Sequence, residues 1–244
     1  MLKIFLFADI MIKNEIILEG VIPMECVKIT ELFDLNGTIA EQLFEGYNYP
    51  YEVLAHIGEY IKNTGVKLDK EKYDYVGENI WIAKSAKVAP TASITGPCII
   101  GENTEVRHCA FIRGNALVGD NCVVGNSTEL KNVVLIGNVQ VPHYNYVGDS
   151  VLGKFSHMGA GAITSNVKSD KTLVTVKIGD KKIETGLKKF GAILGDGVEV
   201  GCGSVLNPGT IIGKNTNVYP LSSVRGFVKA NSIYKKAGEV ADKR

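Results

Sequence analysis

An apolar residue recurs at every sixth position over long stretches of this chain. Isoleucine, valine or leucine occupies positions 82, 88, 94, 100, 106, 112, 118, 124, 130 and 136, and the spacing returns at Leu152 and Met158 after a slip around Pro142. It resumes from Leu194 to Val224. A period of six fits neither a helix nor an alternating strand and is typical of a parallel β-helix, in which each hexad forms one side of a triangular coil. We therefore expect a mainly β protein whose periodic residues point into the coil.

The first part of the chain lacks this period. Residues 1–77 predict a small N-terminal α/β domain, with an apolar opening that reads as a strand or as a leader ahead of a domain beginning near Met24. The T-I-A-E string at Thr38–Glu41 has the spacing of a capping box. A second helix is expected from Pro50 to about Gly65. Its apolar stripe consists of Val53, Leu54, Ile57 and Ile61.

The period is also lost in residues 165–191. Val174, Val176 and Ile178 alternate before the turn-forming pair Gly179-Asp180, which predicts an extruded β-hairpin. We expect the coil itself to occupy residues 78–232 and residues 233–244 to leave it as a basic tail. Lys235 and Lys236 in that tail are candidates for contacts with phosphates, although a solvated tail is the simpler reading.

Charge and cysteine content exclude several classes of protein. Lysine plus arginine (27) balances aspartate plus glutamate (26), so no overall charge favours nucleic acid or an anionic membrane as a partner. The five cysteines are an odd number without a C-x-x-C pair, which argues against a disulfide framework or a structural zinc site and fits a reducing cytoplasm. No stretch reaches the roughly 20 apolar residues of a membrane-spanning helix.

Two strings within the coil carry a family resemblance. HYNYVGDSVLG begins at His143, and GAGAITSN ends at Asn166. With the hexads, they resemble the left-handed β-helix hexapeptide-repeat acyltransferases, and closely the acetyltransferase domain of the bifunctional enzymes that acetylate glucosamine 1-phosphate and then uridylylate it. The resemblance covers about residues 78–232 and implies the left hand of the coil. Nothing in residues 1–78 resembles the nucleotidyltransferase domain with its G-x-G-T-x-M loop, so we expect a stand-alone relative of the acetyltransferase half.

The resemblance implies a role for each matching residue. His143 is the general base that takes a proton from the sugar amine as the amine attacks acetyl-CoA, a task suited to imidazole. Asn166 orients the thioester or the amine. The sugar phosphate is held by Arg113, Lys131, Tyr146 and Lys189.

Four positions depart from the family pattern. His157 replaces an asparagine of the substrate site and is expected to donate to the sugar. Val167 replaces a tyrosine, and Cys202 and Pro220 replace small residues near the coenzyme, so that acetyl-CoA is expected beside Asn166, Val167, Cys202 and Pro220. The long inserted hairpin resembles archaeal versions of the domain, some of which accept galactosamine 1-phosphate.

The family also implies a homotrimer with its active sites between subunits, and a place in UDP-N-acetylglucosamine biosynthesis. We expect direct transfer without an acyl-enzyme, because Cys109 and Cys202 read as small coil fillers. Three alternatives stay open. They are a zinc site like that of the carbonic-anhydrase-like β-helix proteins, disfavoured by the spacing of His108, His143 and His157; a non-catalytic sugar-phosphate or nucleotide-sugar binding protein; and a different amino-sugar acceptor. In the preferred interpretation no metal is required for acetyl transfer. Without the resemblance, a lone histidine such as His143 would more often be structural than catalytic.

Overall fold

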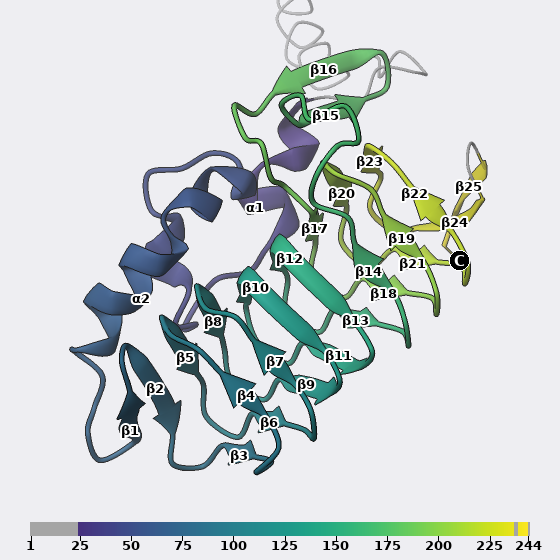
Figure 1. Ribbon diagram of the computed structural model, residues 1–244. Coiled ribbons are helices and arrows are strands. Elements are labelled where there is room, and N and C mark those ends of the chain that lie inside the picture. The colour runs from purple at the N-terminus through teal and green to yellow at the C-terminus, as the bar shows by residue number, and fades with distance from the viewer. Residues whose placement is uncertain (1–23, 237–238, 244) are drawn as a thin grey trace, which may run out of the picture.

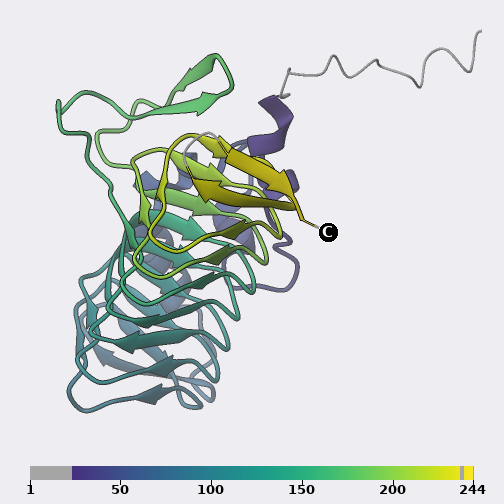
Figure 2. The ribbon, with the colours of Figure 1, turned by 90° about the vertical axis from the view of Figure 1, so that its right-hand side faces the viewer.

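The computed structural model describes residues 24–236 and 239–243, and in them the chain forms a parallel β-helix (Figures 1 and 2). The predicted mainly β fold is confirmed. The apolar opening, with its reading as a strand or leader, lies outside the described residues.

The coil has three faces, which we number for reference. Face 1 consists of β3 (Lys87–Val88), β6 (Glu105–Val106), β9 (Val123–Asn126), β11 (Gln140–His143), β13 (His157–Met158), β18 (Glu199–Val200), β21 (Asn217–Val218) and β24 (Ser232–Lys236). Face 2 consists of β4 (Ser93–Ile94), β7 (Phe111–Ile112), the first halves of β10 (Glu129–Leu135) and β12 (Tyr146–Leu152), β14 (Ile163–Thr164), β19 (Val205–Leu206) and β22 (Ser223–Val224). Face 3 consists of β2 (Ile80–Ala83), β5 (Cys98–Ile100), β8 (Ala116–Val118), the second halves of β10 and β12, β17 (Ala192–Leu194), β20 (Thr210–Ile212) and β23 (Phe227–Val228). β1 (Tyr73–Gly77) pairs antiparallel with β2.

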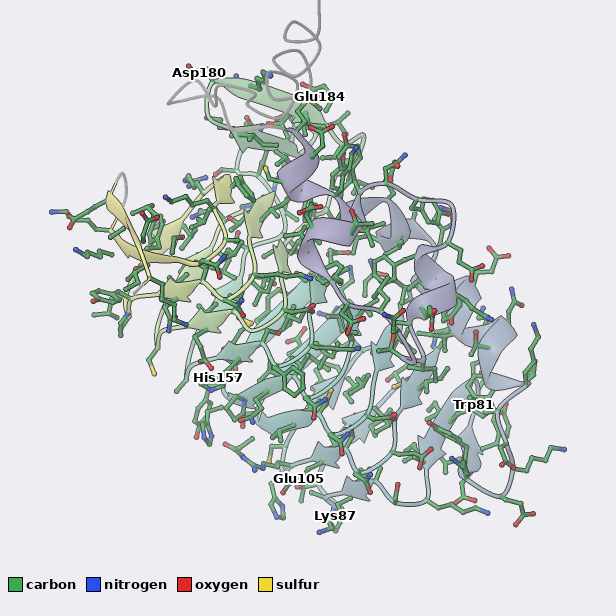
Figure 3. All side chains as sticks on the ribbon, turned by 180° about the vertical axis from the view of Figure 1, so that it is seen from behind. Trp81, Lys87, Glu105, His157, Asp180 and Glu184 are labelled. Atoms are coloured by element: carbon green, nitrogen blue, oxygen red, sulfur yellow. The ribbon has the colours of Figure 1, made fainter. Side chains whose placement is uncertain are left out.

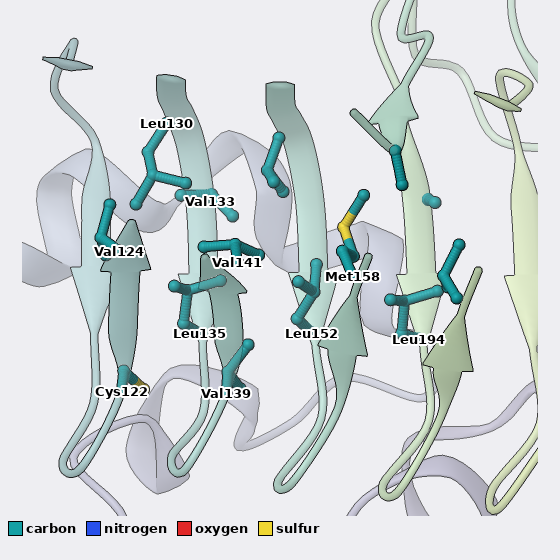
Figure 4. Close-up of a cluster of buried hydrophobic side chains, with 14 of the residues drawn as sticks. Cys122, Val124, Leu130, Val133, Leu135, Val139, Val141, Leu152, Met158 and Leu194 are labelled. Carbon is teal, nitrogen blue, oxygen red and sulfur yellow. The ribbon is translucent and has the colours of Figure 1, made fainter. Parts of the chain in front are cut away.

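The inward residues of successive coils stack in columns, as Figure 4 shows for Val124, Val141 and Met158. The sequence prediction placed Ile136 inward and the register slip near Pro142, and both placements are wrong. Leu135 points inward, whereas Ile136 packs outside the coil. The hexad loses one residue within β10 and again within β12, at the corner between faces 2 and 3. Leu135 and Ile136 are equally apolar, so periodicity alone could not choose between them.

Face 3 carries a second hydrophobic core outside the coil. The N-terminal segment lies along it as η1 (Met24–Val27), α1 (Ile29–Leu32), η2 (Glu41–Phe44), η3 (Pro50–Ala55) and α2 (Ile57–Gly65), where η denotes a 3-10 helix. The expected stripe on its second helix is buried against outward residues of the face. The segment reaches from the coil of Trp81 to the coil of Asp196: Leu32 accepts a hydrogen bond from the Asp196 amide (3.0 Å), and Gly65 packs on Trp81, which Figure 3 shows beside α2.

Helix ends in this segment differ from the expected ones. Thr38 caps no helix, because its Oγ1 donates to the carbonyl of Leu35 (2.8 Å). A reciprocal cap lies instead at Tyr49, whose amide donates to Glu52 (2.7 Å). The helix begins at Pro50 as expected, but its first turns are 3-10, and the α-helical part starts at Ile57.

The inserted hairpin is confirmed. β15 (Thr175–Ile178) pairs antiparallel with β16 (Lys181–Glu184) across Gly179-Asp180. One side of the hairpin is packed, because Val174, Val176 and Ile178 are buried in the core of face 3.

The C-terminus differs from the expected tail. β24 pairs in parallel with β21, so the coil continues past Ser232, and β25 (Glu239–Asp242) pairs antiparallel with β24. Tyr234 closes the end of the coil core, with its hydroxyl donating to the carbonyl of Ser223 (3.0 Å). Lys235 and Lys236 form ion pairs with Glu239 (3.5 and 3.1 Å).

Candidate functional site

Polar side chains gather on face 2 and at its corner with face 3. Arg113 follows β7, Lys131 lies in β10, Tyr146 begins β12 and Asn166 follows β14. Because β7, β10, β12 and β14 are successive strands of one parallel sheet, these residues occupy neighbouring coils. Four of the predicted site residues are thereby brought to one region of the surface.

Asp149 is the centre of this cluster. Its side chain is almost fully buried, and Lys131 Nζ lies 3.3 Å from both carboxylate oxygens. Asn166 Nδ2 donates to Oδ2 (2.5 Å), and Asn132 Nδ2 donates to Oδ1 (3.0 Å). A buried carboxylate requires such partners, since an unpaired one carries a large desolvation cost. Asp149 therefore fixes the positions of Lys131 and Asn166.

The network extends in two directions. Asn166 Nδ2 also donates to the hydroxyl of Tyr146 (3.3 Å), so both amide hydrogens are used. Glycine at position 148 leaves room for the Tyr146 ring, because a Cβ there would lie 2.5 Å from the hydroxyl oxygen. In the other direction, Asn132 Nδ2 donates to the carbonyl of Leu54 (3.0 Å), which ties the N-terminal segment to the cluster.

Arg113 lies at the exposed end of the cluster. Its Nη1 is 2.6 Å from Glu129 Oε1, and this hydrogen bond raises the pKa of the guanidinium. Glu129 is opposite Tyr146 in the β10–β12 register. Burial raises the pKa of the Tyr146 hydroxyl, which keeps this group a neutral donor and acceptor.

Lys189 lies beside Asn166. The amide of the next residue, Phe190, donates to the carbonyl of Asn166 (3.0 Å), and the Lys189 side chain is exposed. The inserted segment thus returns to the coil at the cluster, with the backbone of Lys189 next to that of Asn166.

His143 ends β11, at the edge between faces 1 and 2. Although the period was expected to slip around the preceding Pro142, His143 pairs in register with Asn126, and its carbonyl accepts from the Gly161 amide (3.0 Å). Its side chain is exposed. Cys202 and Pro220, both exposed, continue the same edge in later coils. The structure therefore places His143 in line with two predicted coenzyme residues, whereas Asn166 and Val167 lie at the corner of faces 2 and 3.

His157 lies apart from the other predicted substrate residues. It belongs to face 1, opposite Gln140 and Glu199, and Figure 3 shows it from behind the view of Figure 1. Its Nδ1 is 2.8 Å from Glu199 Oε2. Within one chain, His157 does not join Arg113, Lys131 and Tyr146.

Sequence reasoning missed Asp149, Asn132 and Glu129. The available signal was a charged residue inside the apolar string YVGDSVL, since a buried aspartate requires partners. Among residues 24–236 and 239–243, no three histidine, cysteine or acidic side chains converge as a metal site. All five cysteines are free. No helix in the described part of the chain has the length and apolar character to cross a membrane.

Parts of this chain are similar to known proteins. The family described as the GMPPB C-terminal domain matches residues 94–217. "Bifunctional protein GlmU" of Methanococcus vannielii is 34% identical over 112 residues, which are 46% of this chain and 27% of that protein. "Bifunctional sugar-1-phosphate nucleotidylyltransferase/acetyltransferase" of Sulfurisphaera tokodaii is 33% identical over 102 residues, 42% of this chain and 25% of that protein.

The matched segment thus spans about a quarter of the length of these relatives. Among solved structures, a point mutant of the N-acyltransferase AntD of Bacillus cereus, in complex with dTDP and coenzyme A, is 19% identical, with a TM-score of 0.35 over 68% of this chain and 82% of that one. The family match covers more than half of the sequence, from β4 to β21, and the chain belongs to the family of the GMPPB C-terminal domain.

Proposed function

We propose that the protein is an acetyl-CoA-dependent N-acetyltransferase acting on a hexosamine 1-phosphate, glucosamine 1-phosphate or galactosamine 1-phosphate. The observation that carries the proposal is the buried Asp149, which holds Lys131 and Asn166 in place beside Tyr146 on an uncovered face. The names of the archaeal relatives support the same reaction class.

The acceptor phosphate is assigned to the cations of the cluster. A phosphomonoester carries close to two negative charges near neutral pH and needs several donors, since one exposed ion pair contributes little. Arg113, Lys131 and Lys189 supply them from separate segments. The sugar is assigned to Tyr146, which is opposite Glu129 and Ile163 in the register of face 2 and whose hydroxyl accepts from Asn166.

In the transfer step, the amine nitrogen forms a bond to the acetyl carbonyl carbon while the bond from that carbon to sulfur breaks. His143 takes the proton that the amine loses, and the coenzyme leaves as a thiol after protonation. Within one chain His143 and Asn166 lie at opposite edges of face 2, so the base and the orienting amide at one amine would come from neighbouring subunits of the proposed homotrimer. Asn166 is restricted to one part of its predicted role. Both Nδ2 hydrogens are used within the protein, so its Oδ1 is the atom left to accept from the amine and orient it.

A homotrimer is part of the proposal. Face 3 is covered by the N-terminal segment and the hairpin, which leaves faces 1 and 2 for neighbouring subunits. Packing face 1 of one subunit near face 2 of the next would bring His157 toward the sugar site, which a single chain does not do. Acetyl-CoA is the co-substrate, and the five free thiols fit a cytoplasmic setting.

The test is thiol release from acetyl-CoA by the purified protein with glucosamine 1-phosphate, galactosamine 1-phosphate or free glucosamine. We expect turnover of a phosphorylated acceptor, and a loss of about two to four orders of magnitude in His143→Ala without loss of folding. His108→Ala is the matched control, because His108 is an exposed histidine two coils away on the same edge.

Full activity of His143→Ala would remove the base from the proposal. If the folded wild type releases no thiol with any acceptor but binds a sugar phosphate, the non-catalytic alternative is favoured.

A further inference from the structure

A polar cavity of about 430 Å³ lies between the inserted hairpin and the later coils. Four cations line it: Lys168 from the loop before the hairpin, Lys177 and Lys182 from its two strands, and Arg225 after β22. Asp170 is the acidic residue of the lining, and it pairs with Lys168 (3.4 Å). Lys177, Lys182 and Arg225 form no ion pair with any described residue. The cavity therefore has an excess of positive charge.

The hairpin strand that bears Lys177 is held against the coil at two glycines. A Cβ at Gly209 would lie 2.7 Å from the carbonyl oxygen of Thr175, and a Cβ at Gly226 would lie 2.9 Å from that of Lys177. Both glycines have positive φ, and Val176 is buried on the other side of β15. The backbone that carries Lys177 is thus held against the coil that carries Arg225.

The cations also oppose one another within the hairpin. Lys177 lies directly opposite Lys182 in the β15–β16 register. Like charges opposite each other destabilise an antiparallel pair, and a local conflict of this kind is expected at functional sites. An anion in the cavity would remove the conflict.

We propose that this cavity binds the phosphate groups of a nucleotide, with Lys177, Lys182 and Arg225 as its ligands. Two sources share this chemistry: the phosphorylated adenosine end of coenzyme A, and a nucleoside diphosphate, free or joined to a sugar. Position favours the first source. β12, β14 and β19 separate Lys131 in β10 from Arg225 after β22, which is four strand spacings or about 19 Å. A ligand that reacts near Lys131 with its phosphates here must be long, as the pantetheine arm makes coenzyme A. For that source the inference rests on the proposed function.

The test measures binding by calorimetry to the full-length protein without an acceptor. The probes are coenzyme A, dephospho-coenzyme A (which lacks the 3′-phosphate) and UDP. The variants are Arg225→Ala and Lys182→Ala, and the matched control is Lys181→Ala, an exposed lysine of the same strand outside the cavity lining. We expect each of the two variants to weaken binding of coenzyme A at least tenfold and the control to change it less than twofold.

Each result decides between the sources or against the site. If the variants lose more affinity for coenzyme A than for dephospho-coenzyme A, the cavity binds the coenzyme. If they lose affinity for UDP alone, the cavity binds a nucleoside diphosphate. Unchanged affinity of both variants for all three probes would overturn the proposal. Since no acceptor is present, this result is independent of whether acetyl transfer occurs.

Discussion

Faces 2 and 3 belong to the same coils, and β10 and β12 run through both, yet their outward side chains differ. On face 3 these are apolar and fully buried beneath helices and hairpin, as at Leu117, Val134 and Ile193. On face 2 the outward positions include Glu129, Tyr146 and Ser223, and none is fully buried. The inward hexad residue therefore builds the coil, whereas the outward residues decide whether a face is covered or left for ligands and neighbours.

The largest effect should come from a matched pair of truncations. Ile193→Ala on face 3 removes a fully buried side chain and should lower the free energy of unfolding by about 2–5 kcal/mol. Ile163→Ala at an outward position of face 2 should cost less than about 1 kcal/mol, because its side chain is only half-buried. Urea unfolding of both variants measures the difference. Equal losses would show that face 2 is covered as fully as face 3, by a neighbouring subunit in the assembled protein.

The uncovered face depends on its buried carboxylate. Asp149→Asn keeps the size of the side chain and suits the left-handed backbone at this position, but it leaves Lys131 without its counter-charge and places two amide groups against each other. We expect kcat/KM for the acceptor to fall about 100-fold, through both kcat and KM, because small displacements of reacting groups have effects of this size. Asp74→Asn, an exposed aspartate paired with Lys84, is the control. A kcat/KM within twofold of wild type would contradict the positioning role.

The covered face should respond to alkaline pH. Burial raises the pKa of Tyr51, which packs on Phe190, to about 12. The folded state then keeps a proton that the unfolded state releases above pH 10. The stabilisation is complete below pH 10 and is lost as pH rises toward 12, by about 1.4 kcal/mol at pH 11. In urea titrations at pH 8 and 11, the free energy of unfolding of Tyr51→Phe should fall by about 1.4 kcal/mol less than that of the wild type. An equal fall in both proteins would refute the assignment.

The smallest effect concerns Glu129, which neutralises Arg113 on the uncovered face. Glu129→Gln should leave the free energy of unfolding within about 1 kcal/mol, because the pair is exposed. It should lower the KM for a phosphorylated acceptor a few-fold and leave that for free glucosamine unchanged. Glu105→Gln, which breaks a comparable exposed pair with Arg107 on face 1, is the control. A higher KM would mean that Glu129 binds the sugar itself.

Much of the coil could be predicted because its stacking is one-dimensional. Each hexad contacts its equivalent in the next coil, so the spacing alone identifies inward positions such as Val124 and Leu130. The hairpin followed from local turn chemistry at Gly179-Asp180. The packing of the N-terminal segment and the hairpin on face 3 was not predicted. The sequence did contain a signal for it, because apolar residues lie beside the periodic ones, such as Leu117 next to Val118.

The site was predicted in its residues but not in its organisation. Arg113, Lys131, Tyr146 and Asn166 came from a resemblance, and the role of Asp149 depends on partners from two other coils that no spacing rule connects. The face of His157 could have been inferred. It lies 14 residues after His143, which is less than one coil, so the two cannot share a column.

The N-terminal segment that runs along face 3 has a consequence for how the molecule comes apart. A solenoid whose repeats touch only their neighbours can fray from either end, one repeat at a time. Here one continuous strap joins the coil of Asp196 to the coil of Trp81, so an early and a late coil are linked through the same helices. We therefore expect the coils between Trp81 and Asp196 to unfold together, because none of them can separate from its neighbours before the N-terminal segment detaches.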